Sequence, residues 1–154
     1  MSSTCNSGRL TESYCAAIQP ARTHADFFNH LCIDTDHLLL AVFEDAGSVM
    51  DTVLSTFDIN VHSVLSEFVR LHPTGPVQNC SGIIPSSGDT KTASDYSFKE
   101  ADCLKQRHVE IFHLFIGLLR IECGAAVRLL TNIGENVHLL RRETLQFIGD
   151  HHAS

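Results

Sequence analysis

Apolar residues recur along most of this chain with the spacing of an α-helix. The two most apolar runs cover residues 38–43 and 114–119, and a histidine opens each of them, His37 and His113. A helix that is apolar on nearly every side has no face to present to water, so both runs predict helices buried at the centre of the fold. The segments around them carry a single apolar stripe and predict amphipathic helices.

The two runs belong to an internal duplication. At an offset of 76 residues, the segment from residue 37 to residue 67 aligns without a gap with residues 113–143. Shared composition alone does not hold one register over this length, so the sequence predicts two copies of one structural unit. The matched pairs include Leu54 with Leu130, Asn60 with Asn136, His62 with His138 and Glu67 with Glu143.

The pattern predicts an all-α fold of eight helices in two pseudo-symmetric repeats of four. Thr11 is expected to cap a first helix that reaches residues 30–33 and kinks or splits at Pro20, because proline removes an amide donor. Thr35 is expected to cap the second helix and Asn60 the fourth. The expected helices cover about 12–33, 36–45, 48–57 and 61–71, then 90–104, 110–120, 124–130 and 137–148.

A change of composition separates the two repeats. From residue 72 to about residue 89 the chain is rich in proline, glycine and serine and has no periodicity, which is typical of a linker. We therefore expect one domain over residues 1–154, with repeat one at about 9–71, the linker at about 72–89 and repeat two at about 90–149.

Composition excludes several classes of function. A hydrophobic content of 44% against 19% charged residues indicates a globular chain, and a net charge of −7 argues against nucleic acid as a partner. No apolar run approaches the ~18 residues of a membrane span, and residues 1–9 lack the apolar core of a secretion signal, so we expect a cytoplasmic protein without a membrane partner. The six cysteines form no Cys-x-x-Cys pair, which favours reduced thiols over a zinc site.

Three segments together resemble a known family. They are Gly-Arg-Leu-Thr-Glu at residues 8–12, Thr-Asp-His-Leu-Leu-Leu at 35–40, and the repeated histidine-led block at 112–120. They look like the double Clp N motif, the amino-terminal domain of the ClpA and ClpC class of AAA+ unfoldases. The resemblance spans residues 8–149, and the first repeat is closer to the pattern than the second.

The resemblance implies a protein-binding module that receives adaptors and substrates. The chain has no Gly-x-x-x-x-Gly-Lys-[Ser/Thr] loop and no Ser/His/Asp or Cys/His catalytic set, so we expect no enzyme activity and no cofactor. It is similar to stand-alone Clp N proteins. The implied function is that of an accessory or adaptor-like factor of the Clp unfoldase/protease system. The implied partners are Clp ATPase or protease components, adaptors and degradation substrates.

The resemblance also implies a ligand site. In some ClpC proteins each repeat carries a pocket for phosphorylated arginine, made by the helix-start threonine and the glutamate before the histidine. The matching residues here are Thr11 and Asp36, expected at the surface, and a weaker second pair, Ser87 and Phe112, in which phenylalanine replaces the carboxylate. The alternative is that Thr11 and Asp36 only support two helix starts.

A metal centre is the rival hypothesis. Asp34-x-x-His37 and Glu110-x-x-His113 each place a carboxylate and an imidazole three residues apart, as four-helix di-iron carboxylate proteins do on two of their helices. The competing interpretation is that both histidines are buried and hydrogen-bonded to backbone groups near a helix start. Under this second interpretation we expect no bound metal. The further carboxylates that a di-iron site requires are Glu12 and one of Asp95, Glu100 or Asp102, which do not occupy equivalent positions.

Overall fold

A computed structural model describes residues 10–27, 30, 32–44, 49–71 and 86–152 of the chain. Within these residues the backbone forms eight α-helices, and its β-structure consists of two isolated bridges, which confirms the predicted all-α fold. The helices are α1 (Glu12–Phe27), α2 (Thr35–Glu44), α3 (Val49–Thr56), α4 (Val61–Leu71), α5 (Gly88–Cys103), α6 (Ile111–Leu119), α7 (Ala125–Asn132) and α8 (Val137–His152).

The predicted duplication is visible in the helix starts. Helices α5, α6, α7 and α8 begin 76 residues after α1, α2, α3 and α4 respectively. The register read from His37 and His113 therefore holds for all four pairs. The second repeat begins earlier than the predicted Thr90, because the Ser87 side chain caps α5 by accepting the Thr90 amide at 3.1 Å. Residues 72–85 of the predicted linker lie outside the described residues.

Two predicted helix ends differ from the observed ones. Helix α1 is not split at Pro20, which lies within it, and it ends at Phe27, before residues 30–33. It ends there because the His30 amide donates to the Ala25 carbonyl at 2.8 Å, a bond that spans five residues and closes a helix C-terminus. Helix α8 continues past the predicted Ile148 to His152.

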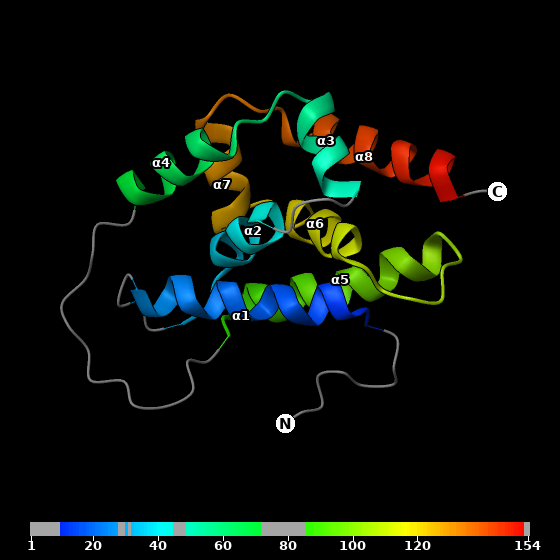
Figure 1. Cartoon of the computed structure of the whole chain (residues 1–154), viewed down its shortest axis with the longest axis horizontal. Helices are drawn as coiled ribbons and strands as arrows, with labels where there is room; N and C mark the ends of the chain where they lie inside the picture. The colour runs from blue at the N-terminus through cyan, green and yellow to red at the C-terminus, as the bar shows by residue number, and fades with distance from the viewer. Residues whose placement is uncertain (1–9, 28–29, 31, 45–48, 72–85, 153–154) are drawn as a thin grey trace.

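The helices form three layers, with α2 and α6 in the middle. Figure 1 shows α1 and α5 on one side of this pair and α3, α4, α7 and α8 on the other. Every residue of α6 is buried, as are Thr35 to Phe43 of α2. The two histidine-led runs are therefore the central helices that their apolar pattern predicts.

The repeats are joined by a reciprocal exchange of short segments. Leu10, before α1, bridges to Val109, before α6, and the Thr11 amide donates to the Val109 carbonyl at 3.2 Å. In the same way Ser86, before α5, bridges to Ile33, before α2. Leu10 and Ser86 are equivalent positions, as are Ile33 and Val109. Each repeat therefore begins against the central helix of the other.

Candidate functional site

The two histidine-led helix starts have the same hydrogen-bond geometry. The Asp34 amide donates to His37 Nδ1 at 2.8 Å, and the Glu110 amide donates to His113 Nδ1 at 2.8 Å. An amide can only donate, so both imidazoles carry their proton on Nε2. The Nε2 of His37 donates to His30 Nδ1 at 2.7 Å, and that of His113 to Gln106 Oε1 at 2.8 Å.

These hydrogen bonds decide between the two interpretations of the histidines. His37 is 2% exposed and His113 is fully buried, and each ring bonds a backbone amide at a helix start, which confirms the structural interpretation. The di-iron hypothesis is not supported, because the lone pair of each Nδ1 already accepts an amide. One of its further carboxylates, Glu100, pairs with Arg120 at 2.8 Å. In the part of the chain that the structure describes, no three His, Cys, Asp or Glu residues group as metal ligands.

The structure places the predicted pocket residues in a different pairing. Ser87 lies at the start of α2, where its hydroxyl donates to Asp34 Oδ1 at 3.0 Å. Thr11 lies at the start of α6, through its bond to Val109. Helix α1 has 16 residues, about 24 Å of helix, and its whole length separates Thr11 from the turn that leads to α2. The predicted pairs are Thr11 with Asp36 and Ser87 with Phe112. In the structure Ser87 lies at the start of α2, which carries Asp36, and Thr11 lies at the start of α6, which carries Phe112.

Asp36 is buried, which corrects the expectation that it lies on the surface. It is 1% exposed, and its Oδ1 accepts the His37 amide at 2.9 Å. Phe112, the equivalent residue at the start of α6, is also 1% exposed and packs against the His113 ring, with 4.4 Å between centroids. The accessible carboxylate at the start of α2 is that of the half-buried Asp34, which accepts the Thr35 amide at 2.7 Å as well as the Ser87 hydroxyl.

Thr35 has a role that the sequence did not reveal. The prediction that it caps its own helix is wrong, because its hydroxyl accepts the Ala126 amide in the first turn of α7 at 3.0 Å. Thr35 is fully buried and so links the start of α2 to a helix of the other repeat. Thr11 and Asn60 cap as predicted, by accepting the Tyr14 amide at 3.2 Å and the His62 amide at 2.8 Å.

The start of α2 is an anionic environment beside free helix amides. Burial raises the pKa of the nearby Cys32 thiol, and the carboxylates of Asp34 and Asp36 add to the rise. Helix α5 begins at the same place, and the amides of its first turn, including those of Gly88 and Asp89, have no acceptor within the helix. Carboxylates that suit a cation therefore lie next to amides that suit an anion.

Four of the six cysteines lie in the described segments. Cys15, Cys32, Cys103 and Cys123 are free thiols. The raised pKa keeps Cys32 protonated and unreactive at neutral pH. The other two cysteines, Cys5 and Cys80, lie outside the described residues.

The fold and the two histidine-capped helix starts define a duplicated four-helix domain, all-helical and built around two buried helices. The family model of the Clp repeat (R) N-terminal domain matches residues 9–95, and the chain belongs to this family. Among the helices that the structure describes, none is long and apolar enough to cross a bilayer.

Curated relatives and solved structures agree with the family. The chain is 30% identical over 142 residues to the ATP-dependent Clp protease ATP-binding subunit ClpC of Staphylococcus saprophyticus, a match that covers 92% of this chain and 17% of the relative. The same subunit of Staphylococcus aureus strain USA300 is 29% identical over 143 residues, covering 93% and 17%. The chain thus spans about a sixth of the length of these relatives.

Two solved N-terminal domains share the fold. That of ClpD from Arabidopsis thaliana has a TM-score of 0.76 at 19% identity, covering 94% of this chain and 97% of that domain. That of Hsp104 from Candida albicans has a TM-score of 0.76 at 16% identity, covering 91% of each chain.

Proposed function

We propose that this chain is a non-catalytic protein-recognition domain that acts as an accessory or adaptor-like factor of the Clp unfoldase/protease system. Its membership of the Clp N-terminal domain family supports the proposal, as does its similarity to relatives named as ATP-binding subunits of the Clp protease. The observation that carries it is the start of α2, where Asp34 and Ser87 meet across the two repeats. The ligands implied are proteins: Clp components, adaptors or degradation substrates.

We further propose that the start of α2 binds segments carrying a phosphorylated arginine. A guanidinium suits the Asp34 carboxylate, backed by the buried Asp36, and a phosphate suits the first-turn amides of α5. We assign Ser87 as the hydroxyl of this site, and its hydrogen bond to Asp34 Oδ1 at 3.0 Å supports the assignment. The start of α6 is the weaker site, since Phe112 supplies no carboxylate where α2 has Asp36.

Capture from native cytosol tests the general proposal. We expect the immobilised wild-type chain to enrich Clp components or degradation substrates, as identified by mass spectrometry, and a Ser87→Ala chain to enrich fewer of them. The matched control is Thr11→Ala, which removes the equivalent helix cap of α1, beside the start of α6. A wild-type capture no different from that of blank resin contradicts the proposal.

A further inference from the structure

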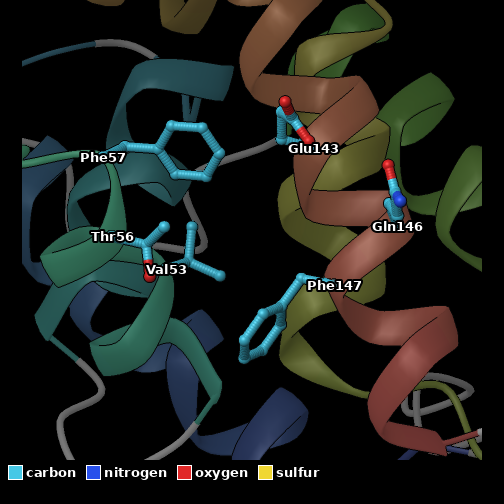
Figure 2. A pocket seen from close by; sticks show the side chains of 6 residues that line it. All are labelled: Val53, Thr56, Phe57, Glu143, Gln146 and Phe147. Atoms are coloured by element: carbon cyan, nitrogen blue, oxygen red, sulfur yellow. The ribbon is translucent and has the colours of Figure 1, made fainter.

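A cleft of about 360 Å³ lies between α3 and α8, on the side of the central layer away from α1 and α5. Figure 2 shows Val53 and Phe57 on one side of the gap and Glu143 and Phe147 on the other, with Gln146 farther from the gap on α8. Its floor and walls are mainly apolar, with one carboxylate and one amide from α8 beside them, a composition typical of small binding clefts. The lining residues are Val53, Thr56, Phe57, Glu143, Gln146 and Phe147.

The duplication provides an internal comparison for this cleft. The equivalent contact, between α7 and α4, is bridged by a hydrogen bond from α7 to Glu67, which is also paired with Arg70 one turn along α4. Asn132 Nδ2 on α7 donates to Glu67 Oε2 on α4 at 3.0 Å, and Arg70 Nε donates to Glu67 Oε1 at 3.0 Å. The hydrogen bond from Arg70 is the main cause of a lowered pKa at Glu67. The chain thus shows which groups satisfy a glutamate at this position.

Both of these groups are missing at the cleft. Glu143 is equivalent to Glu67, but Thr56 stands in place of Asn132 and Gln146 in place of Arg70. Threonine is shorter than asparagine, and glutamine carries no charge. Within the described part of the chain, Glu143 forms no ion pair or hydrogen bond through its side chain. The cleft therefore has an open apolar floor beside a carboxylate without a cation.

We propose that the α3–α8 cleft binds a peptide segment of a partner protein that presents an arginine next to an apolar side chain. The guanidinium supplies to Glu143 what Arg70 supplies to Glu67, in the planar geometry that arginine and carboxylate share. The apolar side chain enters between Val53, Phe57 and Phe147. The net charge of −7 favours a basic partner. This surface goes beyond the proposed function, because it shares no residue with the start of α2.

The first test uses two short peptides as probes, acetyl-Ala-Phe-Arg-Ala-amide and the same peptide with citrulline, an uncharged isostere of arginine. Nuclear magnetic resonance of the ¹⁵N-labelled chain measures the chemical shifts of the backbone amides of α3 and α8 as peptide is added to millimolar concentration. We expect shifts at the cleft and an affinity for the arginine peptide about three- to tenfold higher than for the citrulline peptide. Glu143→Gln should abolish that preference. The exposed Glu122, in the turn before α7, provides the control Glu122→Gln, which should keep it.

A second variant uses the duplication itself. The double substitution Thr56→Asn with Gln146→Arg installs the two groups that bond Glu67 at the equivalent α4–α7 contact, and it should remove binding of both peptides without unfolding the chain. Equal affinity for the arginine and citrulline peptides, or shifts confined to other helices, would overturn the proposal. A concentration-dependent dimer that the double substitution dissociates would assign the cleft to a second copy of the chain and would also overturn it. None of these substitutions touches Asp34 or Ser87, so failure here leaves the proposed function standing.

Discussion

Replacing His113 with alanine is expected to lower the free energy of unfolding by about 3–5 kcal/mol. The imidazole is fully buried at the start of α6, so its removal leaves a cavity in the central layer. It also leaves the Glu110 amide and the Gln106 side chain without the partners that they have at 2.8 Å. The loss is a large part of the ~5–15 kcal/mol that stabilises a typical domain. Urea denaturation at pH 8 measures it.

Two further variants separate the causes of that loss. His113→Phe keeps most of the buried volume and removes only the hydrogen bonds, so it should cost less than His113→Ala. His138→Ala, in the exposed first turn of α8, should change stability by less than about 0.5 kcal/mol. A loss below about 1 kcal/mol for His113→Ala would contradict the role assigned to the buried imidazole.

Replacing Gly117 with alanine is expected to destabilise the chain by about 1–3 kcal/mol, although alanine is the better helix former. A Cβ at this position would lie 2.5 Å from the Ala93 carbonyl oxygen and 3.2 Å from the Ser97 amide nitrogen. Both atoms belong to the backbone of α5 and cannot turn away, so α5 and α6 would have to separate. Thermal and urea unfolding measure the loss.

The first repeat supplies the matched control. Ala41 occupies the position in α2 equivalent to Gly117 and is itself buried, so the α1–α2 contact already accommodates a methyl group. Ala41→Gly should therefore cost only about 1 kcal/mol, from helix propensity and a lost methyl contact. A Gly117→Ala chain as stable as the wild type would mean that this glycine does not set the spacing of α5 and α6.

The architecture could be predicted from the sequence because the duplication appears in local patterns of apolar and capping residues. The 76-residue offset between His37 and His113 carries through to every helix start, and the apolar runs mark the two buried helices. Asn60 and Thr11 cap as expected, because capping depends on a few neighbouring residues.

The candidate site was only partly predictable because its geometry depends on contacts between the repeats. Periodicity gives no information on which segment lies beside Val109 or Ile33, so the exchange that places Ser87 at α2 was missed. Asp36 has the sequence context of an exposed first-turn acid, and only tertiary packing buries it. The sequence favours Thr35 as the cap of its own helix, because its actual partner, the Ala126 amide, lies 91 residues away in the sequence.

The α3–α8 cleft could not be found from the sequence, because it depends on two small differences between equivalent positions. Thr56 and Asn132 are both short polar residues in a helix. Gln146 and Arg70 are both long polar residues in a helix. Their effect appears only when the helices are placed, since Asn132 and Arg70 both reach Glu67. The comparison of the two repeats in space, rather than their alignment, therefore shows where the molecule is open.

Isothermal titration calorimetry with a peptide that carries one phosphoarginine tests most directly the claim that the start of α2 is a recognition site. The wild-type chain should bind it, and Ser87→Ala and Asp34→Asn should each weaken binding by about tenfold, as expected for the loss of one hydrogen bond to a charged group. Thr11→Ala loses the equivalent helix cap at the α6 end and should bind like the wild type. Absence of binding by the wild type, or weakening by Thr11→Ala but not by Ser87→Ala, would contradict the claim.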